Sequence, residues 1–315
     1  MRLGVWGAAV SVVETTSQAP GTGGRWAVPA PLCIPGRACQ VPDMQRREFL
    51  VATALGAAGL GSGRMPSDHP GPDDTFDASS IASMPAPTRK ILIAGGGFNR
   101  AFIRYMAALS GKPCPRICYL PTASADSADG IINFYRECAG LDVEPHVQRS
   151  FIESLSQTQG WDDVLLSMDG IVCSGGNTLN QQAIWKAQGI DVVLRAAWEK
   201  GVVLGGASAG SLCWFEEGTT DSRPKVLSIV TCLGFLAGSH SPHYDKEPGR
   251  RPLYQQLVGS GTMKPGYACD NDAGIYFEDT SVKRVVSTRA DAKVYYVSVV
   301  NGAVVERTME PERIS

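Results

Sequence analysis

The fold is decided by the stretch VVLGGASAG, residues 202–210. A short apolar run that ends in glycine is typical of a buried strand, and the G-x-S-x-G of residues 206–210 fits a sharp turn from a strand into a helix. Small residues suit this turn because a Cβ beside the serine would clash with the adjoining backbone. The pattern predicts that Ser208 is exposed as a nucleophile; a packing turn built from small residues is the alternative.

Other apolar runs end in small residues in the same way, and stretches with helical spacing separate them. The runs are residues 90–94 before GGG, 116–120 before PTAS and 169–173 before SGGNT, with a further strand expected at 144–148. The helical stretches are residues 102–109, 131–139, 179–186 and 191–200. Strands that alternate with helices predict an α/β fold of three layers, in which a mostly parallel sheet has helices on both faces.

The sequence pattern changes after about residue 261, where short β-rich segments replace the alternation of strands and helices. The segments are residues 267–270, 274–277, 284–288 and 293–300. They predict antiparallel strands toward the C-terminus that close the same sheet. Because no repeat interrupts residues 89–315, we expect this range to be one catalytic domain.

The N-terminal part of the chain lacks the alternation. Residues 1–43 are rich in Gly, Pro, Ser and Ala, and we expect them to be a disordered upstream extension before Met44. The sequence MQRREFL, residues 44–50, and the apolar stretch after it resemble a twin-arginine signal, with a linker up to residue 88. The motif predicts export to the periplasm or the cell exterior by the twin-arginine machinery; a chance basic pair would leave the protein in the cytoplasm.

The composition argues against several classes of partner. The chain is 43% hydrophobic and 19% charged, with a net charge of −2. A nucleic-acid-binding domain is normally basic, so we expect no nucleic-acid partner. No run approaches the roughly 20 apolar residues of a membrane-spanning helix, so we expect no membrane span. No Cys/His cluster has zinc-like spacing, so we expect no metal.

Two backbone N–H groups are candidates for stabilising an oxyanion beside Ser208. The N–H of Ala209 follows the serine directly, at the start of the expected helix. The second candidate is Gly176, because its Gly-Gly loop ends the preceding strand and parallel strands place their sites beyond their carboxyl ends. Asn177 is a candidate for substrate binding, for capping the next helix, or for both.

A serine nucleophile needs a base, and His243 is the favoured histidine of the four in the chain. It lies with His240 in GSHSPHYD, residues 238–245, and the proline before it restricts the loop. An ordinary surface histidine is the alternative. An α/β-hydrolase places its acid between serine and histidine, but no histidine follows His243 here. An orienting residue must therefore come after the histidine.

Three motifs in this order carry a family resemblance: GGNT at 175–178, GASAG at 206–210 and SPHYD at 241–245. They resemble peptidase family S51, which includes aspartyl dipeptidase (peptidase E) and cyanophycinase. The resemblance implies a class I glutamine-amidotransferase-like α/β fold and a Ser-His-acid site without a metal or other cofactor. It places Ser208 on the nucleophile and His243 on the base.

The third member of the site departs from the family pattern. The matching stretch is ACDNDAG, residues 268–274, and an ungapped match puts Asn271 where the family has an acid. An amide can orient a histidine, as in Cys-His-Asn peptidases. A shift of one residue in the turn would give the role to Asp270 or Asp272 instead.

The resemblance implies hydrolysis of a small peptide through an acyl-enzyme, by an exopeptidase or an isopeptidase. Arg100, beside the glycine loop at 95–97, is a candidate for binding a substrate carboxylate; a solvated helix arginine is the alternative. An esterase or amidase with the same site and a catalytically weak ligand-binding homologue are the competing functions. The sequence leaves the substrate and the oligomeric state open.

Overall fold

A computed structural model describes residues 87–151 and 157–315 of the chain. The expected upstream extension and the twin-arginine motif lie outside these residues. Within them, the strands are β1 (Lys90–Ala94), β2 (Arg116–Leu120), β3 (Glu144–Val147), β4 (Gly170–Cys173), β5 (Val203–Ala207), β6 (Phe215–Arg223), β7 (Val226–Thr231), β8 (Leu236–Ser241), β9 (Gly266–Cys269), β10 (Ala273–Glu278), β11 (Ser281–Ser287), β12 (Val294–Val300), β13 (Ala303–Met309) and β14 (Glu312–Arg313). The helices are α1 (Arg100–Ser110), α2 (Ala128–Cys138), α3 (Trp161–Leu165), α4 (Thr178–Gln188), α5 (Ile190–Glu199), α6 (Ala209–Leu212) and α7 (Arg250–Gly259), with a 3₁₀ turn η2 (Thr122–Ser124).

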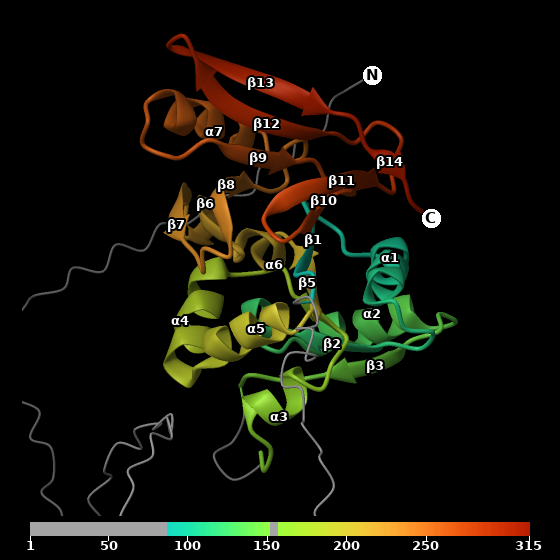
Figure 1. Cartoon of the computed structure of the whole chain (residues 1–315). Helices are drawn as coiled ribbons and strands as arrows, with labels where there is room; N and C mark the ends of the chain where they lie inside the picture. Colours follow the sequence, from blue (N-terminus) through green and yellow to red (C-terminus); the bar gives the residue numbers. More distant parts are fainter. Residues whose placement is uncertain (1–86, 152–156) are drawn as a thin grey trace, which may run out of the picture. The chain divides into compact units, whose positions relative to one another are not determined.

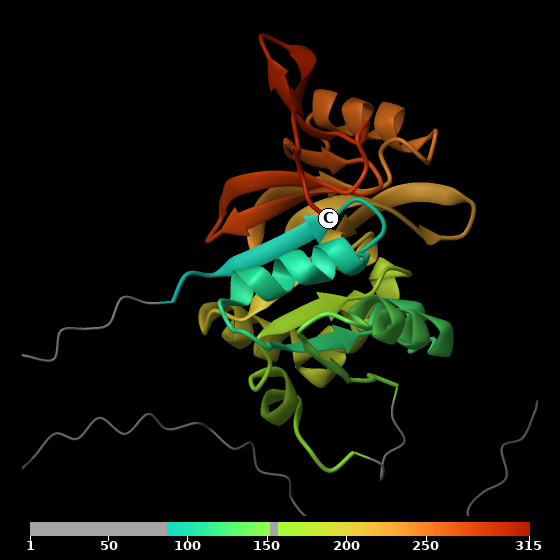
Figure 2. The same ribbon diagram turned by 90° about the vertical axis from the view of Figure 1, so that its right-hand side faces the viewer.

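The main sheet has the strand order β14-β11-β10-β1-β5-β4-β2-β3. The run from β1 to β3 is parallel throughout, as the alternation of strands and helices predicts. Figures 1 and 2 show helices on either side of this sheet. β5 lies between β1 and β4, so Ser208 follows a central strand and emerges at the carboxyl edge of the sheet.

Alternation along β1 explains the two layers of helices. Ile91 and Ile93 point to one face, into a core shared with α5 and with Trp185 of α4. Leu92 and Ala94 point to the other face, against Phe102 and other apolar residues of α1 and α2. Successive side chains of a strand point to opposite faces, so a strand that is apolar at every position needs cover on both.

The expectation that all C-terminal strands close the main sheet is wrong. β10 and β11 join it, with β10 antiparallel to β1. β9, β12 and β13 instead form a second sheet together with β6, β7 and β8, in the order β13-β12-β9-β8-β6-β7. β-rich composition indicates strands but not their partners, which depend on contacts between distant segments. The strands β6 to β8 between Ser208 and His243 were not predicted as a sheet.

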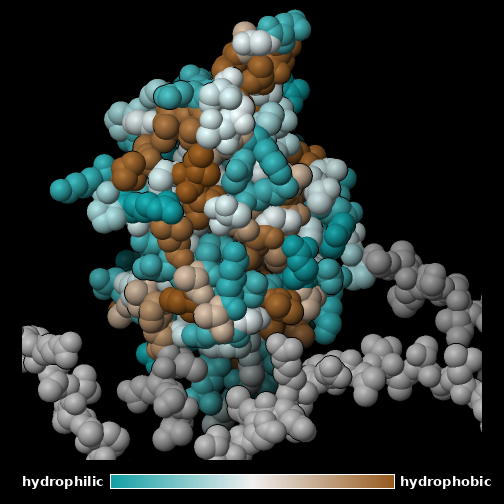
Figure 3. All heavy atoms as spheres, turned by 90° about the vertical axis from the view of Figure 1, so that its left-hand side faces the viewer, coloured by the Kyte–Doolittle hydropathy of each residue, from teal (hydrophilic) through white to brown (hydrophobic). Residues whose placement is uncertain are grey.

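The surface on the side of β7 and α4 is mixed in character. Figure 3 shows hydrophobic residues there interspersed with hydrophilic ones. Across the part of the chain that the structure describes, no helix is long and apolar enough to cross a bilayer.

Candidate active site

Ser208 occupies a strained turn between β5 and α6. Its backbone has φ 58° and ψ −118°, a combination that residues other than glycine rarely adopt. Glycine is required on both sides: a Cβ on Gly206 would lie 2.3 Å from the carbonyl oxygen of Cys173, and one on Gly210 would lie 2.0 Å from it. The expected sharp turn is therefore present, and its strain holds the Ser208 side chain beyond the end of the strand.

The helix after Ser208 is shorter than the motif predicts. α6 contains only Ala209–Leu212 before the chain enters β6. A macrodipole requires aligned peptide units over several turns, so one turn offers local N–H groups rather than a strong dipole. The N–H of Ala209 makes no hydrogen bond within residues 87–151 and 157–315, so it is free to bind another acceptor.

His243 connects Ser208 to Asn271. Its Nε2 lies 2.8 Å from Ser208 Oγ, and its Nδ1 lies 2.7 Å from Asn271 Oδ1. An amide oxygen only accepts, so Nδ1–H must be the donor in that contact. The neutral ring then leaves Nε2 free to accept the Ser208 proton, which is the arrangement that activates a serine.

Gly96, just after β1, makes room for the contact between His243 and Asn271. A Cβ on this glycine would lie 2.3 Å from Asn271 Oδ1 and 2.7 Å from His243 Nδ1. The neighbouring carbonyl of Gly95 accepts the backbone N–H of His243 at 3.2 Å, and Gly96 forms a parallel bridge with Asn271. The glycine run after β1 thus brings together two segments that are 28 residues apart.

The two aspartates that flank Asn271 face elsewhere. Asp270 is buried, and its Oδ2 accepts the backbone N–H of Lys293 at 2.9 Å; burial raises the pKa of this carboxyl. Asp272 Oδ2 lies 3.4 Å from Arg289 Nε. Of the three candidates, only Asn271 hydrogen-bonds to His243 in the described part of the chain.

The loop after β4 lies directly against Ser208. A Cβ on Gly175 would be 3.3 Å from Ser208 Cβ, and one on Gly176 would be 2.2 Å from the carbonyl oxygen of Ala123. Gly176 has φ +132°, which favours glycine. Among the residues that the structure covers, nothing accepts its N–H, so this group is available beside the serine.

Comparison with known proteins identifies the chain. The profile of peptidase family S51 matches residues 91–285. The chain belongs to peptidase family S51. It is 41% identical over 221 residues to YgaJ, an uncharacterized peptidase of Bacillus subtilis (strain 168), and the match covers 69% of this chain and 94% of that protein. Its fold is similar to the crystal structure of a peptidase from an acI-B1 Actinobacterium, with TM-score 0.57 and 15% identity over 73% of this chain and 98% of the other. Family membership implies a serine peptidase.

Asp245 and Arg289 of this S51 peptidase hold the backbone of Asn271. Asp245 Oδ1 accepts the N–H of Asn271 at 2.8 Å, and its Oδ2 pairs with Arg289 Nη2 at 2.5 Å. The same Nη2 donates to the carbonyl oxygen of Asn271 at 3.1 Å. Asp245 ends the SPHYD motif, so the sequence contained a signal for it; nothing in the sequence pointed to Arg289.

His240, the other histidine of the motif, is connected through Ser211 to the turn at Ser208. It is fully buried, its Nδ1–H donates to the carbonyl oxygen of Tyr267 at 3.0 Å, and its Nε2 lies 3.0 Å from Ser211 Oγ. The Ser211 hydroxyl in turn lies 2.8 Å from the carbonyl oxygen of Ser208. Burial lowers the pKa of His240 to about 3, so the ring stays neutral and packs under the site.

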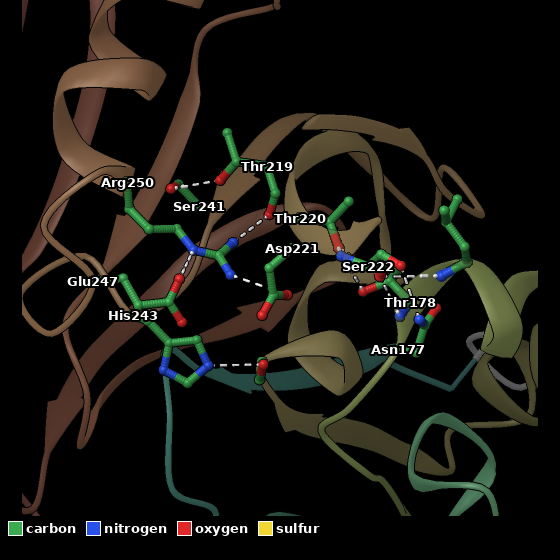
Figure 4. Close-up of polar contacts among 12 residues, drawn as sticks. Asn177, Thr178, Thr219, Thr220, Asp221, Ser222, Ser241, His243, Glu247 and Arg250 are labelled. Carbon is green, nitrogen blue, oxygen red and sulfur yellow. Dashed lines mark hydrogen bonds and ion pairs between the residues drawn. The ribbon is translucent and has the colours of Figure 1, made fainter. Parts of the chain in front are cut away.

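A polar network fixes the β6–β7 hairpin beside the site of the S51 peptidase (Figure 4). The buried guanidinium of Arg250 donates to the carbonyl oxygen of Thr219 and to Glu247, both at 2.6 Å, and lies 3.4 Å from Asp221. Figure 4 shows this cluster next to His243. No sequence motif pointed to this cluster, because its members come from β6, α7 and the loop before α7.

Asn177 also contacts the β6–β7 hairpin, at Ser222 of β6. Its side chain accepts the N–H of Asn180 at 3.0 Å and donates to the carbonyl oxygen of Ser222 at 3.0 Å. The expectation that Asn177 caps a helix is confirmed. Both ends of its amide are thereby occupied, which leaves it little capacity to bind substrate.

A cavity of about 190 Å³ opens at Ser208. It is lined by Gly97, Phe98, Tyr119, Gly130, Asn133, Phe134, Glu137, Val172, Cys173, Ser174, Gly175, Ala207 and Ser208. Arg100 is not among these residues. Its guanidinium donates to the carbonyl oxygen of Arg136 at 3.0 Å, which places the charge at the carboxyl end of α2 rather than in the cavity.

Proposed function

We propose that this S51 peptidase hydrolyses peptide or isopeptide bonds of small peptides through an acyl-enzyme on Ser208. The observation that carries the proposal is the hydrogen-bonded chain from Ser208 through His243 to Asn271. A hydroxyl paired to a neutral imidazole, which a third group orients, is the arrangement of a serine nucleophile. The free N–H groups of Ala209 and Gly176 supply donors for an oxyanion.

The proposed reaction has two stages, acylation of Ser208 and hydrolysis of the acyl-enzyme, and His243 transfers a proton in both. Ser208 Oγ attacks the scissile carbonyl carbon while His243 Nε2 takes the hydroxyl proton, and the carbonyl oxygen becomes an oxyanion held by the two N–H groups. The imidazolium gives its proton to the leaving amine as the C–N bond breaks. Water then attacks the acyl-enzyme, with His243 taking its proton and returning it to Ser208.

An esterase or amidase activity at the same site is the second candidate. Asn271 is neutral, so it orients His243 without compensating the charge of the imidazolium. The imidazolium then forms less readily, so His243 is a weaker general base than it would be beside a carboxylate. A weaker base favours substrates with a more reactive carbonyl and a better leaving group, and an ester has both in comparison with a peptide amide. Family membership and the strained turn at Ser208, after the central strand β5, also support a fold of the class I glutamine-amidotransferase type.

Labelling with a fluorophosphonate tests the proposed chemistry. We expect one adduct, located on Ser208 by peptide mass spectrometry, because these probes react with activated serines. Turnover of a dipeptide library and of p-nitrophenyl esters by the 89–315 domain then distinguishes a peptidase from an esterase. A folded protein that neither labels nor turns over either class would be a ligand-binding homologue and would overturn the proposal.

A further inference from the structure

The cavity at Ser208 has a single charged side chain in its wall. Of the residues that line it, only Glu137 is charged, and none is a lysine or arginine. A group bound there sits next to the scissile bond, because Ser208 itself forms part of the wall. The charge of the wall therefore acts directly on the part of the substrate that lies beside the bond to be cleaved.

Half of the Glu137 carboxylate is free to bind a donor. One oxygen, Oε2, accepts the backbone N–H of Arg100 at 2.8 Å, at the start of α1. The other oxygen makes no hydrogen bond, and the carboxylate forms no ion pair, with any residue of 87–151 or 157–315. The Arg100 guanidinium donates to the carbonyl oxygen of Arg136 and is not part of the cavity wall. Glu137 is half-buried, so solvent screens its charge only in part.

The aromatic wall of the cavity suits a cation as well. The rings of Tyr119 and Phe134 stack at 5.0 Å, and Phe98 lies on the same cavity. Aromatic faces attract ammonium and guanidinium groups and repel carboxylates. Asn133, the remaining polar side chain of α2 in the wall, offers an amide oxygen as a further acceptor.

We propose that this cavity binds a positively charged group of the substrate, an ammonium or a guanidinium, and that Glu137 determines this preference. The inference rests on the proposed function of Ser208 and names the substrate class. It predicts that an aspartate side chain is disfavoured in the cavity, since like charges repel at short range. The cation comes either from a lysine or arginine side chain or from the N-terminal amine of a peptide.

The test uses aminoalkylphosphonate diphenyl esters on the full chain. An activated serine attacks the phosphorus of such a probe and displaces phenol, and it stays covalently modified, so the rate of labelling can be measured without turnover. The probes carry a lysine, norleucine or aspartate side chain, each with a free or an acetylated amine. We expect the lysine probe to label Ser208 about tenfold faster than the norleucine probe if the side chain is the cation. If the cation is the N-terminal amine, acetylation should slow every probe by a similar factor.

The variant Glu137→Gln separates charge from shape, because an amide oxygen can still accept the N–H of Arg100. It should remove the preference for the cationic probe, whereas Glu199→Gln, the same change on an exposed residue of α5 outside the cavity, should not. Asn133→Asp, at an exposed position of α2, should strengthen the preference, and it provides a second measurement if Glu137→Gln does not fold.

Two outcomes would overturn the inference. One is a wild-type enzyme that reacts equally with charged and uncharged probes or prefers aspartate. The other is a preference for the cation that survives Glu137→Gln and does not change in Asn133→Asp. A plain fluorophosphonate distinguishes this failure from failure of the proposed function: if it labels Ser208, only the charge preference is wrong, and if it does not, the nucleophile itself is wrong.

Discussion

Asn271 Oδ1 lies 2.7 Å from His243 Nδ1, on the side of the ring opposite Ser208. A neutral amide therefore occupies the place where a carboxylate would compensate the imidazolium. It fixes the same tautomer as a carboxylate, because either oxygen only accepts. The difference between the two is electrostatic, and it appears only when the ring becomes protonated during catalysis.

Replacing Asn271 with aspartate should add that missing charge. The negative charge favours the cationic form of His243, so the acid limb of the pH–rate profile should move to higher pH. The rate on the plateau should hold or rise, because the imidazolium formed in the transition state is better stabilised. Profiles of kcat/KM for wild type and Asn271→Asp measure both effects.

The flanking aspartates provide controls for this prediction. Asp270 accepts the backbone N–H of Lys293, and Asp272 lies beside the Arg289 guanidinium, so neither carboxylate contacts His243. Asp270→Ala and Asp272→Ala should therefore leave the shape of the pH–rate profile nearly unchanged, whatever they do to stability. A large activity loss in Asp272→Ala, together with a silent Asn271→Asp, would mean that the orienting residue is one position further along.

Removal of the nucleophile should abolish hydrolysis while the fold stays intact. Ser208→Ala deletes the attacking oxygen, and loss of a catalytic serine lowers kcat by about 10³-fold or more. The smaller side chain fits the turn without new contacts. Activity on the best peptide and circular dichroism measure the two quantities; near-normal turnover in a folded variant would refute the assignment.

Gly96→Ala should disrupt the site although it replaces none of the reacting side chains. The new Cβ would lie 2.3 Å from Asn271 Oδ1, so the amide and the imidazole must separate. A displacement of about 1 Å at a catalytic group costs about 10²-fold in rate. Gly249→Ala is the control, because its nearest contact is a flexible leucine side chain at 3.2 Å. Equal activity of the two variants would show that the close approach is not needed.

The sequence contained the elements of the site that are local in the chain. The turn at Ser208 is readable because its glycines follow from sterics at adjacent residues. Asn271 followed from the family resemblance, since spacing alone left three candidates open. Arg289 was not predictable, because its role depends on β11 pairing with β10 and delivering a distant arginine to the same turn.

The second sheet was missed for the same reason. β12 is a recognisable strand, but its pairing with β9 rather than with the main sheet depends on register between distant segments. Arg250 was missed because a buried arginine cannot be told from a surface one without its partners, here Thr219 and Glu247. Sequence patterns describe single elements well and contacts between elements poorly.

Export is a prediction that concerns residues outside those described by the structure. The twin-arginine receptor recognises the arginine pair itself, so Arg46→Lys with Arg47→Lys should retain the precursor in the cytoplasm. Arg64→Lys, a conservative change outside the motif, should be exported normally. Cell fractionation followed by immunoblotting measures the distribution, and undiminished export of the double variant would refute a twin-arginine route.

The buried His240 should make the protein sensitive to acid. Its pKa is lowered to about 3 by burial, whereas an unfolded chain has the ordinary value of 6.5, so the unfolded state binds an extra proton between these values. Stability should therefore be fully present above about pH 6.5 and should fall as the pH decreases toward 3, by up to about 5 kcal/mol from this residue. His240→Phe, which can still stack on Phe215, should show a flatter pH dependence of the free energy of unfolding, whatever its stability at pH 7. Carboxylates contribute to both proteins alike, so the difference in slope between pH 6.5 and 4 isolates the histidine; parallel curves in urea denaturation would show that His240 is not held neutral by the fold.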